Sequence, residues 1–125
     1  DGRLTVDECL RSVGDQRIFA AGDAAAVPGA RMSCQAALPQ GAYVADAIAR
    51  IARGKEPKPF SMSYVSQNVS LGRRNGVIQV SKRDDTPTRF WYGGRAAATT
   101  KETVCKSTVW SARAGVAAAF SGPKK

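Results

Sequence analysis

The positive charge of this 125-residue chain is confined to its second half, and this division constrains the fold more than any other feature of the sequence. Residues 1–57 contain seven basic and seven acidic residues, so their net charge is zero. Residues 58–125 contain twelve basic and three acidic residues, a net charge of +9. A single uniform domain is not expected to show such asymmetry. Pro57 and Pro59 mark the boundary, because a proline cannot continue a helix. The sequence therefore predicts two parts, residues 1–57 and 58–125.

Composition excludes several classes of protein. The hydrophobic fraction of 43% is sufficient for a packed core. The longest unbroken apolar run, residues 116–120, is far shorter than the roughly 20 residues of a membrane span. The absence of histidine excludes Ser-His-Asp and Cys-His chemistry within this chain. The cysteines form no CxxC pair and, without histidine, are too few for a structural zinc site, so reduced thiols in a cytoplasmic protein are expected.

The first part contains the pattern strand, loop, helix. Residues 3–6 alternate polar and apolar side chains, which predicts a short strand. The apolar run 18–21 predicts a fully buried strand that ends where Gly22 permits an unusual backbone conformation. Ser33 is a suitable N-cap for a helix that runs to about Arg53 and stops at Gly54.

The predicted helix has one apolar face and one irregularity. Helical spacing places four apolar side chains on the same face: Val44, Ala47, Ile48 and Ile51. Pro39 donates no backbone hydrogen bond and clashes with the carbonyl group of Gln35. We therefore expect a kink near residues 35–39 that leaves this carbonyl free; the alternative is a helix that begins only there.

The second part changes to strands followed by a helix. Residues 64–71 and 77–80 read as strands around the hairpin signal Asn75-Gly76. A turn at residues 84–87 leads to a third strand at residues 89–92. A helix is predicted from about Thr100 to Phe120. Its apolar stripe, expected to pack inward, consists of Cys105, Val109, Ala112, Val116 and Ala119. The predicted fold is thus α/β to α+β: a strand–loop–helix unit, then a small antiparallel β-meander and a C-terminal helix.

One stretch carries a recognisable motif. Residues 18–24 end in Gly22-Asp23-Ala24, follow the segment Gly2–Asp7 at a short distance and precede the Gln35–Gly41 segment. Together they resemble the closing part of the FAD domain in the pyridine nucleotide–disulfide oxidoreductase superfamily, particularly its type II NADH dehydrogenase-like branch. The resemblance covers residues 2–54 and is looser over residues 64–76. It implies that residues 1–57 are the tail of a Rossmann-like FAD domain.

The resemblance implies a role for five residues in binding FAD. Gly22 lets the backbone approach a ligand closely, and in the family the aspartate matched by Asp23 holds the ribityl chain. In the family, the N-terminus of the next helix points at the pyrimidine edge of the flavin, where negative charge develops on reduction. The match places Cys34, Gln35 and Ala36 at this edge.

Two departures limit the transfer from the family. Pro39-Gln40 stands where quinone-reducing members often carry paired glutamines, which puts a quinone pocket in doubt. No GxGxxG motif is present, so the phosphate-binding turn of a dinucleotide-binding domain is missing. We therefore expect the chain to be a C-terminal fragment, inactive alone, of a flavoprotein that passes hydride from NAD(P)H to FAD and electrons onward. No residue of the chain is assigned to the catalytic step. Homo-oligomerisation remains open.

A different class of function competes with the enzyme fragment. The alternative is a small basic module for nucleic acid or an anionic surface, because Phe90, Trp91 and Tyr92 beside Arg89 are able to stack on bases. The absence of an RNP, KH or zinc-finger pattern disfavours nucleic acid, and the alternative interpretation of this aromatic run is a strand that alternates between core and surface.

The predicted C-terminal helix raises the question of membrane contact. Trp110 shares one outer face with Lys106 and Arg113, a combination that suits peripheral contact at the inner face of a membrane. We favour an ordinary solvated face, or packing of Trp110 on another domain or subunit. The rest of this face is rich in alanine and serine, which leaves too little apolar area for deep insertion.

Overall fold

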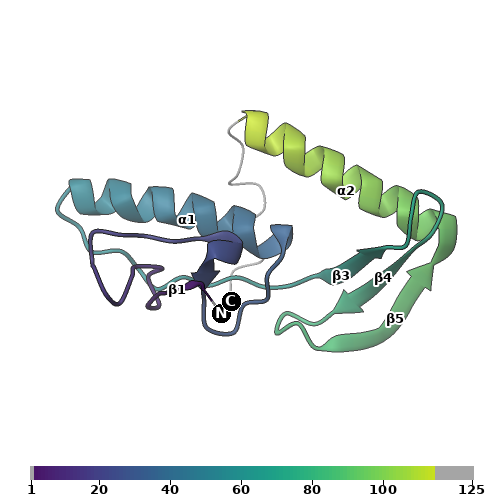
Figure 1. Cartoon of the computed structure of the whole chain (residues 1–125), viewed down its shortest axis with the longest axis horizontal. Coiled ribbons are helices and arrows are strands. Elements are labelled where there is room, and N and C mark those ends of the chain that lie inside the picture. Colours follow the sequence, from purple (N-terminus) through teal and green to yellow (C-terminus); the bar gives the residue numbers. More distant parts are fainter. Residues whose placement is uncertain (1, 115–125) are drawn as a thin grey trace. The chain divides into compact units, whose positions relative to one another are not determined.

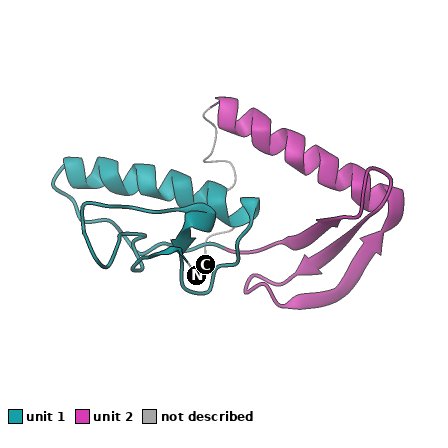
Figure 2. Cartoon of the chain, viewed as in Figure 1, with its two compact units in different colours: residues 1–62, 117–125 teal, residues 63–116 magenta. Residues whose placement is uncertain are grey.

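The computed structural model describes residues 2–114, and Figure 1 shows their helices and strands. These residues form two compact units, residues 2–62 and 63–114, coloured separately in Figure 2. The sequence prediction divides the chain after residue 57, and the compact units divide after residue 62.

The fold is a mixed α/β fold, as predicted. The elements follow one another in the order β1 (Leu4–Thr5), the 3-10 turn η1 (Gly22–Ala24), β2 (Ala25–Ala26), α1 (Cys34–Ala52), β3 (Ser66–Ser70), β4 (Gly76–Ser81), β5 (Pro87–Gly93) and α2 (Gly94–Ala114). Unit 1 holds a two-stranded parallel sheet and α1, and unit 2 holds a three-stranded antiparallel sheet and α2.

In unit 1, the short strands β1 and β2 pair in parallel, with Leu4 opposite Ala25. The core beside them is small. Its fully buried members are Val6, Leu10 and Ala25, and the side chains packed against them are Ala20, Val27, Tyr43, Val44 and Phe60. Helix α1 contributes Tyr43 and Val44 to this core, so the helix is held against the chain that precedes it.

The prediction of a fully buried strand at residues 18–21 is wrong. Phe19 forms only an isolated antiparallel bridge with Arg11, and Ile18 is 47% exposed. The chain folds back before this run because the Asp7 carboxylate accepts hydrogen bonds from the backbone N–H groups of Cys9 and Arg11. A strand buried on both faces needs neighbouring strands and covering helices. Among the described residues this run has only the one bridge.

Helix α1 has the predicted ends. The Ser33 Oγ accepts a hydrogen bond from the Ala36 N–H at 3.2 Å, so Ser33 is the N-cap. After Ala52 the chain reaches Gly54 at φ +69°, a left-handed conformation that ends helices. Pro39 lies inside the helix, so the alternative in which the helix begins only near residues 35–39 is wrong. The kink near Pro39 stays a prediction.

The buried face of α1 differs from the predicted one. Ala47 is buried and Val44 packs on the core, but Ile48 and Ile51 are 50% and 37% exposed. The buried residues of the helix are Ala36, Pro39, Gln40 and Ala47. Small side chains and one polar group therefore face inward, because η1 packs closely against the first turns of the helix.

In unit 2 the predicted meander is present, in the order β3-β4-β5. The hairpin joins Ser70 to Gly76, and its loop is closed by the Leu71 N–H, which donates to the Asn75 carbonyl oxygen at 3.0 Å. Gly76 is not a turn residue. A Cβ there would lie 3.1 Å from the Val69 carbonyl oxygen and 3.2 Å from the Ala98 nitrogen. Glycine is required because α2 crosses β4 at this point.

Helix α2 differs from its prediction in two ways. It begins at Gly94, six residues before Thr100, and the structure describes it to Ala114. The predicted inward stripe is wrong: Cys105, Val109 and Ala112 are exposed, while Val116 and Ala119 lie outside the described residues. The buried residues of the helix are Ala97, Ala98 and Ser111. The close approach at Gly76 fixes which face meets the sheet, and it selects small side chains over the larger ones of the stripe.

The outer face of α2 is arranged as expected. Lys106, Trp110 and Arg113 are all exposed, with Trp110 66% exposed. Among the described residues, neither helix is long and apolar enough to cross a bilayer. Peripheral contact of this face with a membrane stays a prediction.

Candidate functional site

The candidate site in unit 1 lies where η1 meets the first turns of α1. Gly22 opens η1 with φ +69°, a conformation that side chains with a Cβ rarely adopt. A Cβ at Gly22 would lie 3.2 Å from the Ala37 Cβ. Glycine therefore serves both purposes expected of it: it allows the turn and it allows close packing on the helix.

A buried glutamine fixes this turn. The Gly22 N–H donates to the Gln40 Oε1 at 2.7 Å, and Gln40 is only 2% exposed. A buried side-chain amide bonded to a backbone N–H holds the turn and the helix together. Sequence analysis did not assign this role to Gln40. Its position four residues after Ala36 places both on one face of α1, but the sequence does not show that this face is buried.

Asp23, the second residue of η1, is exposed. Its carboxylate makes no hydrogen bond or ion pair with any residue that the structure describes. The hydrogen bond at Gly22 fixes the backbone next to it. The carboxylate is thus held on a defined backbone and is available to accept hydrogen bonds from hydroxyl groups of a ligand.

The three residues predicted at the start of α1 differ in exposure. Cys34 is an exposed free thiol, and Gln35 is half-buried, with its Oε1 accepting from the Arg31 Nη2 at 3.3 Å. Ala36 is 2% exposed, and its N–H already donates to Ser33 at the helix cap. The positive end of the helix dipole favours a negative charge near Cys34.

The structure brings Gly22 and the first turns of α1 into one packed arrangement through Ala37 and Gln40. It thereby joins the two segments that the sequence analysis assigned to one cofactor. No group of three or more residues with metal-binding side chains occurs in residues 2–114. What the arrangement offers chemically is an acceptor carboxylate, a close backbone approach and a positive helix end.

The clearest electrostatic perturbation in unit 1 lies in its core. Burial raises the pKa of Tyr43 well above its usual range, and the neighbouring Cys9 adds to the rise. The Tyr43 hydroxyl therefore stays protonated and donates to the Lys58 carbonyl oxygen at 2.5 Å. This bond ties α1 to the segment that leads out of unit 1. At the surface, the Arg17 guanidinium lowers the pKa of Asp15.

No protein-family model matches the chain, and no curated protein matches it significantly.

Proposed function

We propose that the chain is the C-terminal part of a flavoprotein oxidoreductase and that η1 and the N-terminus of α1 bind FAD. The observation that carries the proposal is the Gly22 turn. It is pinned on α1 by Gln40 and leaves the Asp23 carboxylate exposed beside it. This is the arrangement that a sugar-binding aspartate at a glycine turn requires.

The residues present fit a flavin cofactor. Asp23 would accept hydrogen bonds from the ribityl hydroxyl groups, and the backbone at Gly22 would lie against the cofactor. The first turn of α1, with the exposed Cys34 at its start, would face the pyrimidine edge of the ring. Its helix dipole would stabilise negative charge there. The bound flavin itself supplies the hydride chemistry, with NAD(P)H as donor in the parent protein. The Ala36 N–H would contribute only if a ligand displaced its hydrogen bond to Ser33.

The proposal is tested by Asp23→Ala in the parent enzyme. A hydrogen bond to a charged group contributes about 1.5–3 kcal/mol, so FAD affinity should fall roughly ten- to a hundredfold. The measurement is flavin fluorescence after serial dilution. Asp46→Ala, an exposed carboxylate farther along α1, is the matched control and should retain FAD. Equal retention by both variants would make Asp23 a turn residue only.

The 125-residue chain provides a second test. We expect it to retain no FAD through gel filtration, since it contains no glycine-rich loop for the pyrophosphate. Tight, stoichiometric flavin on this chain would overturn its assignment as part of a divided FAD site.

One observation favours a second candidate function, the binding of single-stranded nucleic acid by unit 2. Phe90 and Trp91 are 76% and 66% exposed on β5, an edge strand, beside the exposed Arg89. The interpretation of this run as alternating between core and surface is therefore wrong. Exposed aromatic rings next to basic groups suit base stacking.

The test of the second candidate is tryptophan fluorescence of the Trp110→Phe variant, in which Trp91 is the sole tryptophan. Addition of oligo-dT should quench this fluorescence in a salt-dependent manner if unit 2 binds nucleic acid. Unchanged fluorescence at low salt would exclude the function.

A further inference from the structure

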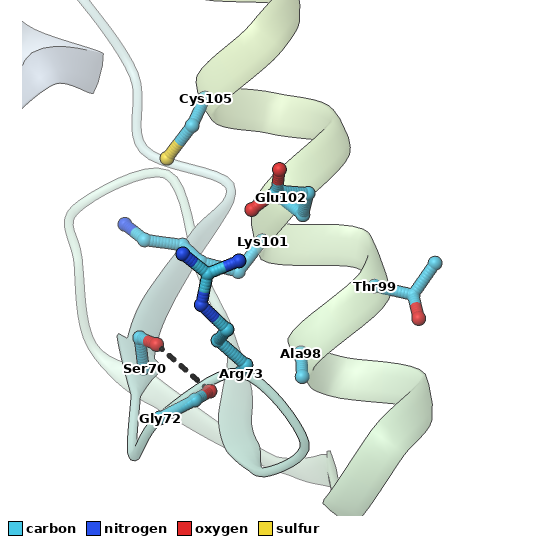
Figure 3. Close-up of a pocket in the computed structure, with 8 residues that line it drawn as sticks. All are labelled: Ser70, Gly72, Arg73, Ala98, Thr99, Lys101, Glu102 and Cys105. Carbon is cyan, nitrogen blue, oxygen red and sulfur yellow. Dashed lines mark hydrogen bonds between the residues drawn. The ribbon is translucent and has the colours of Figure 1, made fainter.

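Unit 2 contains a hollow that the proposals above do not use. It lies between the β3–β4 hairpin and the first half of α2 and has a volume of about 530 Å³. Figure 3 shows its lining residues, which come from only these two elements. They are Ser70, Gly72, Arg73, Ala98, Thr99, Lys101, Glu102 and Cys105.

The charges around the hollow do not cancel. The side chains of Arg73 and Lys101 make no ion pair or hydrogen bond with any residue between 2 and 114. Glu102, the only acidic residue of the lining, pairs with Lys106 at 3.2 Å. The hollow therefore has two positive charges without a counter-charge and one carboxylate that is already compensated.

The two cations stand on parts of unit 2 that are fixed relative to each other. Lys101 lies on α2, whose first turns are packed on β4 at Gly76. Arg73 lies in the hairpin loop, which is closed by the hydrogen bond from Leu71 to Asn75. In Figure 3 both side chains extend into the space between loop and helix. Little conformational freedom of the backbone is lost when an anion binds between them.

We propose that Arg73 and Lys101 bind the phosphate group of a phosphate monoester in this hollow. A monoester carries a charge of about −1.5 to −2 at pH 7, which matches the two uncompensated positive charges. A guanidinium group binds phosphate oxygens in a bidentate manner, and an ammonium group adds a point charge. The hollow is larger than one phosphate, so part of the esterified group is also accommodated. This proposal does not depend on the flavin assignment.

The test uses the full 125-residue chain and phenyl phosphate, followed by amide chemical shifts at constant ionic strength. Amides of the loop 71–75 and of the first half of α2 should shift, and chloride at the same ionic strength should not reproduce this. Removal of one of the two positive charges should weaken binding about two- to fivefold, for Arg73→Gln and for Lys101→Gln alike. The second pKa of a phosphate monoester is about 6, so binding should also weaken at pH 5.

The matched control is Arg74→Gln, because Arg74 is in the same loop and exposed but does not line the hollow. Its affinity should remain within about 1.5-fold of the unmodified chain, an effect of long-range charge only. An equal loss in all three variants, or shifts spread over both units, would overturn the site. Loss of binding can be distinguished from unfolding, because the same spectra report whether each variant is folded.

A second arm distinguishes the sources of the phosphate group. Vesicles that contain phosphatidic acid present a monoester as a lipid headgroup. Sedimentation with these vesicles that is weakened about two- to fivefold in Arg73→Gln but not in Arg74→Gln assigns the site to a membrane headgroup. Binding of phenyl phosphate without such sedimentation assigns it to a free phosphate monoester. Absence of both overturns the proposal.

Discussion

Different kinds of interaction stabilise the two units, each within itself. In unit 1, single polar side chains bind backbone groups: Gln40 fixes Gly22, Asp7 bends the chain after β1, and Tyr43 holds Lys58. In unit 2, α2 packs on a regular antiparallel sheet. The helix lies so close to β4 that only small residues fit at the contact, which are Gly76, Ala97 and Ala98. The stability of unit 1 should therefore fall when a polar side chain is removed, and the stability of unit 2 should fall when a small side chain is enlarged.

This difference also bears on function. A polar side chain that fixes a turn leaves the next residue, Asp23, free for a ligand. A ladder with one helix leaves its edge strand and the hairpin loop uncovered, and these carry Trp91 and Arg73. The candidate site of unit 1 is accordingly built on a single turn, whereas the candidate sites of unit 2 lie on the uncovered edge strand and beside the hairpin loop.

The largest expected effect is that of Gly76→Ala. The added Cβ meets backbone atoms on β3 and α2 at 3.1–3.4 Å, and neither can move without disturbing the ladder. We expect a loss of about 2–3 kcal/mol in the free energy of unfolding of unit 2. Native-state hydrogen exchange measures it unit by unit.

The control for this variant is Gly41→Ala in α1, where a Cβ meets nothing within 4 Å. It should stabilise unit 1 by about 0.5–1 kcal/mol, because glycine is unfavourable inside a helix. Stabilisation by Gly76→Ala would show that α2 does not pack closely on β4.

The next effect is that of Gln40→Leu in unit 1. The variant has an apolar side chain of similar size, which leaves the Gly22 N–H without its acceptor. We expect a loss of about 1–2 kcal/mol, together with faster hydrogen exchange at Gly22. Gln16→Leu, an exposed position outside the core, should change the stability by less than about 0.5 kcal/mol. Equal effects of the two variants would mean that Gln40 does not hold the turn.

Tyr43→Phe should cost about 1 kcal/mol at pH 7, because it removes the hydrogen bond to Lys58. It should also change the response to alkaline pH. Because the pKa of Tyr43 is raised in the folded state, the folded chain holds this proton more tightly than the unfolded chain. The resulting stability is present below pH ~10 and is lost as the pH rises above it.

The measurement is urea unfolding between pH 7 and pH 11. The unmodified chain should lose more stability over this range than Tyr43→Phe, so their difference should shrink as the pH rises. Tyr92→Phe in unit 2 is the control and should leave the alkaline response of unit 1 unchanged. A constant difference between the two proteins would show that Tyr43 does not titrate with unfolding.

Local signals predicted most elements of the chain. The Ser33 cap, the Gly54 stop and the meander follow from short-range chemistry that needs no partner. The failures share a cause, which is that tertiary contacts decided them. Residues 18–21 have an apolar pattern, but within residues 2–114 they form only one bridge, with Arg11. In α2, the buried face consists of the alanines that fit against Gly76 and not of the predicted stripe at Cys105.

The candidate sites, like the fold, could be predicted from the sequence only where local chemistry determines them. The Gly22-Asp23 turn follows from glycine chemistry, and its positive φ is present. The role of Gln40 was not predictable, because a glutamine inside a helix usually faces solvent and only the packing of η1 shows that this one is buried. The hollow at Arg73 requires the hairpin and α2 to meet, which no spacing in the sequence specifies.

The smallest expected effect on stability is that of Lys106→Ala. The pair Glu102–Lys106 joins side chains that are 66% and 75% exposed at i,i+4 spacing on α2, so its loss should cost only about 0.3–0.5 kcal/mol of unfolding free energy, and less in high salt.

The same variant should change phosphate binding in the hollow more clearly than it changes stability. Without Lys106 the Glu102 carboxylate is uncompensated, and it lines the same space as Arg73 and Lys101. Phenyl phosphate should then bind about two- to fivefold more weakly, while Glu102→Gln should bind it at least as tightly as the unmodified chain. Unchanged binding in Lys106→Ala would show that the carboxylate does not act on the hollow. The unfolding and binding measurements on these two variants would thus separate the stability of unit 2 from the electrostatics of its surface.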